Sequence, residues 1–409
     1  MSYRSLWLAV FGASLFVNAC IAPTPSTLTT GGPTVAAVNP IVPTTNLTDG
    51  CITTYDPTVD YFPEKATLTH SDGFTLEYFK HYKVITVRTP APGAEPLQFV
   101  LVQCGAPTPP GFAETQISQV PVKSIVVMSS TFVTTLDELN LLDRLVGLDE
   151  ATYISNAKVL QMADAGQLTM IGVGAGVNVE QALDLQPELI MAVSAGNVEF
   201  DAHPKLQEAG LKVVLNAEWM ETSPLGRAEW SKFIAAFFNR EAAAETLFAE
   251  RVVQYEELAA LASTVQDRPT VFVNVVARGT WSVPGGHTYI ARFLADAGAD
   301  YLWAGETTNE RLQLSFEEVY DTARDAQFWV NTGRVATVEE LLAGDERYAD
   351  FVAFQTGNLW NNNARLGPNG GNEYWEVGVV HPEIVLADLI TIFHPELLPD
   401  HELVYYLAG

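Results

Sequence analysis

Short apolar runs separated by turn-forming residues dominate the chain between residues 51 and 120. Three of these runs, 74–78, 84–87 and 97–102, alternate between apolar and polar positions, as half-buried strands do. Turn signals at 71–73 and 90–93 flank them. This pattern predicts a small antiparallel β-meander.

From about residue 121 the pattern changes to short β-branched runs that alternate with helical stretches. Such alternation is typical of βα units with parallel strands. We predict strands at 124–128, 189–193 and 213–215 in a first block, and at 271–276 and 328–330 in a second block. The predicted fold class is therefore α/β, with an N-terminal lobe at 121–240 and a C-terminal lobe at 267–409.

One long helix is predicted between the two blocks, at residues 241–265. Apolar side chains recur on it at spacings of three and four, and a polar stripe runs along another side. The apolar stripe consists of Phe248, Val252, Tyr255, Ala259 and Ala262, and the polar stripe carries Glu250, Arg251, Glu256 and Glu257. Asp267-Arg268-Pro269 stops the helix, so residues 241–266 are expected to connect and brace two lobes with parallel central sheets.

The first 50 residues lack the periodicity of a folded domain. Arg4 precedes an apolar run that is too short to span a bilayer, as in a secretory signal peptide at 1–19. The run ends at Val17-Asn18-Ala19-Cys20, which resembles a bacterial lipobox, so we expect lipid on Cys20. An ordinary signal peptide with a chance cysteine is the alternative. Residues 20–50, rich in Thr, Pro and Gly, are predicted to form the lipid anchor and a disordered tether.

Two further cysteines, Cys51 and Cys104, remain in the exported part of the chain. An even pair in a compartment where disulfides persist predicts one disulfide bond. This bond would staple the β-rich extension at residues 51–120. Two free buried thiols are the alternative.

The composition is that of a folded and strongly acidic protein. Of 409 residues, 48% are apolar and 17% are charged, which excludes a disordered chain and a coiled coil. The 49 acidic and 22 basic residues give a net charge of −27, and such a surface repels phosphate backbones and anionic headgroups. We therefore expect no nucleic-acid partner, and contact with a membrane only through the lipid.

Common enzyme motifs are absent from the sequence. The chain has no Gly-x-Ser-x-Gly elbow, no Walker sequence and no His-Glu-x-x-His. We therefore expect that the protein is not an enzyme. An extracytoplasmic hydrolase that uses acids such as Glu218 and Glu221 stays as an alternative.

Two helix starts, one in each block, carry matching residues. Segments 178–184 and 315–321 each begin with a good N-cap, Asn178 or Ser315, and each has an acid in the first turn, Glu180 or Glu317. Compensation of the helix dipole would explain either acid alone. A matched acid in each lobe favours a paired docking site.

In this order of elements, the chain resembles the substrate-binding proteins of bacterial ABC importers, in the class for iron-siderophore complexes, haem and cobalamin. The resemblance covers roughly residues 121–409 and includes the strand-to-helix start at 124–129, the two acid-bearing helix starts and the long helix. It implies a lipid-anchored, extracytoplasmic monomer that captures a metal chelate between two lobes. It also implies that Glu180 and Glu317 form salt bridges with arginines of the membrane permease.

The ligand is then expected in the cleft between the lobes, against loops at strand ends. Arginine suits the oxygens of a ferric chelate, and tryptophan suits a flat apolar face. An ordinary salt bridge for each arginine, and a place in the core for each tryptophan, are the alternatives. The candidate ligand-binding residues are Ser130, Asn197, Trp219, Arg278, Trp281, His287, Tyr289, Trp360, Asn363 and Arg365.

A ferric siderophore is the leading ligand, because arginines and amides suit an anionic, oxygen-rich chelate. Cobalamin comes second, and haem is a further member of the same class. Direct binding of a metal ion by histidines is disfavoured because the seven histidines do not cluster along the chain. We therefore predict no metal site and no cofactor besides the lipid at Cys20, although His287 could serve as an axial ligand to a chelated metal.

Overall fold

The computed structural model describes residues 42–409 except 198, 334 and 336. The predicted signal peptide, Cys20 and residues 21–41 of the tether lie outside the described residues. The tether was expected to extend to residue 50, and this part of the prediction is wrong. Asn46 is buried, and its amide nitrogen donates to the Glu64 carbonyl (2.7 Å) and to Glu241 (2.9 Å). The folded part of the chain therefore includes Asn46.

The N-terminal extension forms a four-stranded sheet. It consists of β1 (Phe74–Tyr78), β2 (Tyr82–Val87), β3 (Leu97–Gln103) and β4 (Ile117–Val120), in the order β1-β2-β3-β4. The predicted antiparallel pairing of the first three strands is confirmed. The fourth strand pairs parallel to β3 and was not predicted. A disulfide bond joins Cys51 to Cys104, the residue after β3.

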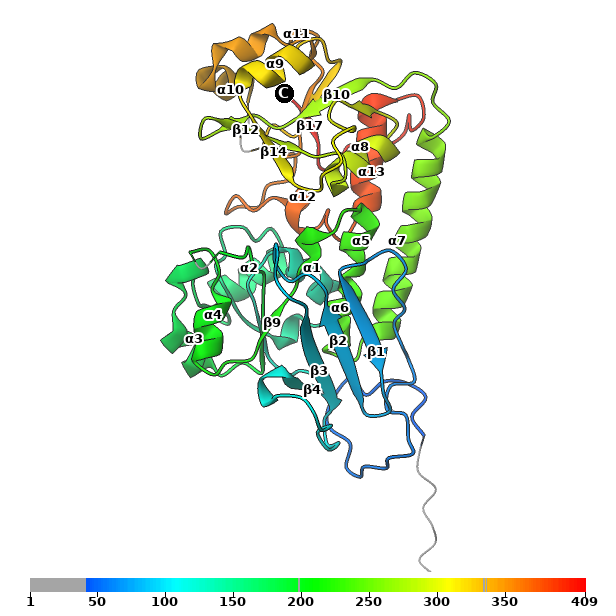
Figure 1. Ribbon diagram of the computed structural model, residues 1–409, viewed down its shortest axis with the longest axis vertical. Helices are drawn as coiled ribbons and strands as arrows, with labels where there is room; N and C mark the ends of the chain where they lie inside the picture. The colour runs from blue at the N-terminus through cyan, green and yellow to red at the C-terminus, as the bar shows by residue number, and fades with distance from the viewer. Residues whose placement is uncertain (1–41, 198, 334, 336) are drawn as a thin grey trace, which may run out of the picture. The chain divides into compact units, whose positions relative to one another are not determined.

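This sheet shares one hydrophobic core with the first lobe and is not a separate domain. Phe74 of β1 packs against Trp230 and Phe233, with ring centroids 4.6 and 5.4 Å apart. Ile85 and Leu101 lie in the same buried cluster. Figure 1 shows β1, β2 and β3 in front of α6 (Ser231–Ala236). The extension therefore covers one side of the first lobe.

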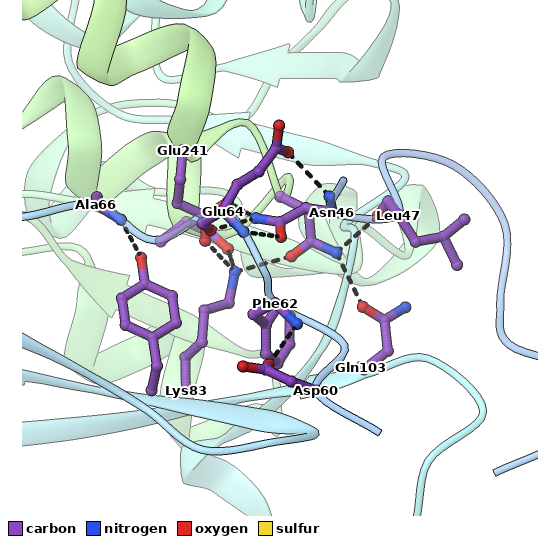
Figure 2. Close-up of polar contacts among 12 residues, drawn as sticks. Asn46, Leu47, Asp60, Phe62, Glu64, Ala66, Lys83, Gln103 and Glu241 are labelled. Carbon is purple, nitrogen blue, oxygen red and sulfur yellow. Dashed lines mark hydrogen bonds and ion pairs between the residues drawn. The ribbon is translucent and has the colours of Figure 1, made fainter. Parts of the chain in front are cut away.

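Buried polar contacts also fasten the extension to the first lobe. The Glu229 carboxylate accepts hydrogen bonds from the backbone N–H groups of Thr69, His70 and Ser71. Lys83 of β2 forms an ion pair of 2.6 Å with Glu241, and both side chains are fully buried (Figure 2). These contacts fasten the extension to Glu229 of α5 (Pro224–Glu229) and to Glu241 at the start of the long helix.

The first lobe is built on a five-stranded parallel sheet in the order β7-β6-β5-β8-β9. Its central strands are buried on both faces, as their continuous apolar runs predict. The strands are β5 (Ile125–Val127), β6 (Leu145–Leu148), β7 (Thr169–Met170), β8 (Leu189–Ala192) and β9 (Val213–Leu215). The helices are α1 (Thr131–Glu138), α2 (Ala157–Asp164), α3 (Val179–Leu185) and α4 (His203–Glu208).

A single helix, α7 (Glu241–Ala262), connects the lobes, as predicted. It follows α5 (Pro224–Glu229) and α6, and it packs against α6 on the first-lobe side and against α13 (Pro382–Phe393) on the second-lobe side (Figure 1). The polar stripe predicted for this helix is wrong at one position. Arg251 is buried, because it forms an ion pair with Glu138.

The second lobe has a five-stranded sheet in the order β13-β10-β15-β16-β17, with β17 antiparallel, and a three-stranded sheet in the order β11-β12-β14. The strands are β10 (Thr270–Val273), β11 (Val276–Ala277), β12 (Thr280–Pro284), β13 (Asp300–Tyr301), β14 (Arg311–Leu314), β15 (Phe328–Val330), β16 (Leu359–Asn361) and β17 (Leu407–Ala408). The helices are α8 (Tyr289–Asp296), α9 (Phe316–Ala323), α10 (Val338–Gly344), α11 (Val352–Gln355), α12 (Glu373–Glu376) and α13. The architecture confirms the predicted α/β fold.

Candidate ligand-binding cleft

A loop that follows strand β6 of the first lobe meets helix α12, which follows strand β16 of the second lobe. The loop after β6 leads to Ser155 and Asn156, and the backbone N–H groups of both donate to the Glu376 carboxylate of α12 in the second lobe, at 2.6 and 3.0 Å. Loops after parallel strands emerge from one edge of a sheet, which is where open α/β sheets bind ligands. The loop after β6 therefore lies at the junction of the lobes, where the ligand-binding cleft is expected from the sequence.

The first-lobe candidates follow three strands at this edge. Ser130 is half-buried and precedes α1, and Asn197 and Trp219 are exposed, Trp219 at 38%. The loop that carries Asn197 is fixed by the buried Asp201, which accepts from the hydroxyl of Ser194 and from backbone N–H groups. These positions are open to a ligand.

The prediction that Trp281 contacts a ligand is wrong. Its side chain is fully buried, and its ring nitrogen donates to the Val273 carbonyl at 2.9 Å. Phe272, Trp329 and Phe351 surround it at centroid distances of 6.1, 5.8 and 6.0 Å. Trp281 is part of the second-lobe core because β12 directs it toward the main sheet of that lobe.

Neither predicted arginine is buried in a pocket. Arg278 is exposed in the hairpin turn between β11 and β12, where its φ is 54°. Arg365 is also exposed and lies 3.3 Å from Glu373.

Trp360 and Asn363 lie at the end of β16, and both are half-buried. The indole nitrogen of Trp360 and the amide oxygen of Asn363 are buried and have no partner within the described part of the chain. Buried polar atoms normally have a hydrogen-bond partner, so these two atoms are suited to a water molecule or a ligand. The amides of Asn361 and Asn372 already have partners, because Asn361 donates to the carbonyls of Gly333 and Val335 after β15, and Asn372 donates to the Asn362 carbonyl.

His287 lines a cavity of about 610 Å³ together with Thr222 of the first lobe. The volume is in the range of small-molecule sites. Arg292 also lines this cavity, and its Nε donates to Asp296 at 2.8 Å. None of the described lining residues is acidic; the polar ones are Thr222, His287, Thr288, Arg292, Thr307 and Asn309.

Tyr289 is covered by an arginine that comes from the first lobe. The Arg227 guanidinium lies 4.4 Å from the centroid of the Tyr289 ring, and two of its nitrogens donate to Glu218 at 2.6 and 2.8 Å. Glu221 accepts from the hydroxyl of Ser71 and from the Trp230 indole. Both acids on which a hydrolase would depend are therefore engaged in holding the fold.

The comparison with known protein families decides the class of this site. Residues 125–363, more than half of the chain, match the model of the periplasmic binding protein family. The chain belongs to this family. Proteins of the family bind and deliver substrates for ABC transporters and are not enzymes.

Relatives and solved structures of similar fold agree with this membership. Two relatives are uncharacterised lipoproteins of Methanocaldococcus jannaschii. One is 28% identical over 76% of this chain and 79% of its own length. The other is 24% identical over 71% of this chain and 70% of its own length. A substrate-binding protein of an ABC transporter from Listeria monocytogenes has a TM-score of 0.51 at 17% identity, covering 67% of this chain and 99% of that one.

Two further structures of similar fold are of a haem-binding protein and of a Ni-His complex. A periplasmic haem-binding protein from Pseudomonas aeruginosa has a TM-score of 0.51 at 21% identity, covering 67% of this chain and 93% of that one. The Ni-His complex of CeuE from Helicobacter pylori has a TM-score of 0.53 at 16% identity, covering 69% and 86%. At these identities the likeness shows the fold alone.

In this periplasmic binding protein, the sequence prediction missed the loop after β6. Asp149 and Glu150 follow that strand directly, and burial raises the pKa of Asp149 to about 6, with Glu150 adding to the shift. The adjacent residues Ser155 and Asn156 contact the second lobe. Two acids after an apolar run that contains Gly147 were the available signal, but the run is short and was not predicted as a strand.

The two candidate docking glutamates occupy matching places in the lobes. Glu180 lies exposed in the first turn of α3, after the N-cap Asn178, and Glu317 lies exposed in the first turn of α9, after Ser315. Glu317 also accepts from Arg347 at 2.9 Å. Its own backbone N–H and Arg347 lower the pKa of the Glu317 carboxyl, so it stays charged near neutral pH.

Neither a metal site nor a membrane span is found where the structure can be described. Among residues 42–409 apart from 198, 334 and 336, no three His, Cys, Asp or Glu side chains are grouped so that they could hold a metal ion. Within the same residues, no helix has both the length and the apolar character that crossing a bilayer requires.

Proposed function

We propose that this periplasmic binding protein is the lipid-anchored, monomeric receptor of an ABC importer and that its ligand is a ferric siderophore. The lipid would be attached to Cys20, in keeping with the lipoprotein names of its archaeal relatives. The ligand would lie between the lobes, where Thr222 of the first lobe and His287 of the second lobe line one cavity. Cobalamin or haem is the second candidate.

The proposal of an anionic chelate rests on the lining of the cavity that contains Thr222 and His287. Bases are scarce in this chain, 22 Lys and Arg against 49 acids, yet His287 and Arg292 both line this cavity and no described lining residue is acidic. The guanidinium and the surrounding hydroxyls can donate to carboxylate, catecholate or hydroxamate oxygens. A cationic ligand would instead face the Arg292 guanidinium.

The first experiment is native mass spectrometry of the chain from residue 21, after incubation with a pool of ferric siderophores, cobalamin, haem and divalent metal ions. We expect one molecule of a ferric siderophore per protein. A one-to-one adduct with cobalamin or haem would mean that this compound, and not a siderophore, is the ligand. If the folded protein bound no member of the pool, the proposed ligand class would be rejected.

Docking to the permease is proposed to use Glu180 and Glu317. Because both side chains are exposed, replacing them with alanine should leave folding and ligand affinity unchanged. Charge pairs at a docking surface mainly set orientation and association rate. We therefore expect uptake of the labelled ligand by cells to fall by about tenfold or more in Glu180→Ala/Glu317→Ala.

Glu339 provides the matched control for this uptake assay. It is an exposed acid in the first turn of α10, so Glu339→Ala removes the same charge from an equivalent helix position. Uptake should be unchanged in this variant. A loss of ligand affinity in the Glu180→Ala/Glu317→Ala protein would contradict the docking assignment.

A further inference from the structure

A segment of the second lobe, Gly367–His381, lies against the first lobe and contains α12. We call it the interlobe clamp. Figure 1 shows α12 on the side of the second lobe that faces α1, and the two helices are in contact. The clamp follows β16, the strand whose end carries the candidate ligand-binding residues Trp360 and Asn363. Any change in its position therefore changes the distance between the two walls of the cleft.

Glu376 makes the first contact of the interlobe clamp. It is fully buried, its carboxylate accepts from the backbone N–H groups of Ser155 and Asn156, and its carbonyl accepts from the Thr134 hydroxyl at 3.1 Å. All three partners belong to the first lobe. A buried carboxylate without hydrogen-bond partners raises the free energy of the folded state. The contact therefore favours one position of the clamp relative to the loop that carries Ser155 and Asn156.

Gly371 makes the second contact, backbone against backbone. A Cβ atom at this position would lie 2.5 Å from the carbonyl carbon and oxygen of Ile154 and 2.7 Å from the Tyr153 carbonyl oxygen. The neighbours are main-chain atoms of the first lobe, so no side-chain rotation can make room. Any larger residue must move the Gly371 backbone and the Ile154 backbone of the first lobe apart by about 1 Å, the difference between 2.5 Å and the 3.4 Å at which ordinary contact begins.

His381 makes the third contact, at the end of the interlobe clamp. Its Nε2 lies 2.6 Å from Glu138 of α1, and its Nδ1 lies 2.8 Å from Glu383 of α13. Arg251 of α7 contacts the same Glu138 carboxylate. The clamp is thus fixed to the first lobe at both of its ends.

We infer that the interlobe clamp sets the width of the ligand cleft, and that Gly371 and Glu376 are positioning residues that determine which size of ligand the protein accepts. The inference about ligand size rests on the proposed function, in which the ligand lies between the lobes. The inference about cleft width is independent of the proposed function. Because the lobes are fastened near the cleft as well as by α7, the binding site is largely preformed, and this lowers the cost of ordering it.

The test measures the distance between spin labels at Asp164→Cys in α2 and Asp321→Cys in α9, both exposed positions, in the full chain. Gly371→Ala and Glu376→Ala should shift or broaden the distance distribution relative to the parent protein. Gly344→Ala is the matched control, because a Cβ atom at Gly344 meets nothing within 4 Å.

Circular dichroism establishes that each variant is folded. Glu376→Gln, which keeps an acceptor oxygen, should change the distance distribution less than Glu376→Ala does. Unchanged distributions in both folded variants would overturn the inference about width.

The second measurement addresses ligand size, with one ferric hydroxamate and one bulkier ferric catecholate as probes. We expect Gly371→Ala to change the ratio of the two dissociation constants by about threefold or more in favour of the bulkier chelate. A wider cleft with an unchanged ratio would overturn the inference about ligand size. If the parent protein bound neither probe, the proposed function would fail, and the spin-label distances would still decide whether the clamp sets the width.

Discussion

Replacing Lys83 with alanine is expected to lower the free energy of unfolding by about 3–5 kcal/mol, because the change leaves a buried carboxylate without its cation. The Lys83 Nζ donates to Glu241 at 2.6 Å, to the Asn239 amide oxygen at 2.8 Å and to the Ala236 carbonyl at 2.5 Å (Figure 2). Lys83 and Glu241 have fully buried side chains. Burial lowers the pKa of Lys83, and Glu241 opposes this shift.

Urea denaturation followed by circular dichroism measures this effect. Lys80→Ala is the matched control, because Lys80 is an exposed lysine of the same extension and its loss should change stability by no more than about 0.5 kcal/mol. Lys83→Met/Glu241→Gln removes both charges and should recover part of the loss, since a buried ion pair can often be replaced by uncharged groups. A loss below about 1 kcal/mol in Lys83→Ala would contradict the conclusion that this ion pair helps to fasten the extension to the first lobe.

The backbone elements were largely predictable because their signals are local. Strands at 213–215 and 328–330 were predicted with the bounds that β9 and β15 have, since each is a continuous apolar run. Helix α7 was predicted from its spacing of apolar residues and ends three residues before the predicted end. Such periodicity depends only on neighbours in the chain.

Buried charges could not be predicted, because their partners lie far away in the sequence. The strand containing Lys83 was predicted to begin after it, and Arg251 was placed on a solvent-facing stripe. Lys83 is 158 residues from Glu241, and Arg251 is 113 residues from Glu138. A charged residue in a sequence is usually exposed, and only the tertiary fold shows when a partner makes burial tolerable.

The sequence predicts which loops could form the site, but it does not show which of them reach the other lobe. The loop that contacts Glu376 of the second lobe, at Ser155 and Asn156, follows β6, a strand that was not predicted. Which side chains of those loops face the cleft depends on packing. Trp281 turned inward to the core, whereas His287, three residues after β12, lines a cavity.

The stability of the protein is expected to fall as the pH rises from about 6 to about 10, because His381 holds a proton in the folded state. Burial disfavours the charged imidazole, but hydrogen bonds to Glu138 and Glu383 outweigh this and raise the pKa of His381 to about 9, although Arg251 opposes the shift. In the unfolded chain the pKa is about 6.5. The charged contacts therefore contribute fully below pH 6.5 and are lost as the pH rises through about 9.

The shift from about 6.5 to about 9 corresponds to about 3 kcal/mol of unfolding free energy. Urea denaturation at intervals between pH 6 and pH 9.5 measures it as the difference between the parent protein and His381→Gln, in which this proton cannot be bound. The difference should be largest near pH 6 and shrink toward pH 9.5. His287→Gln, at an exposed histidine, should show the same pH dependence as the parent. A difference between the parent and His381→Gln that stayed constant over this range would mean that His381 is not protonated between Glu138 and Glu383, and that the third contact of the interlobe clamp is uncharged.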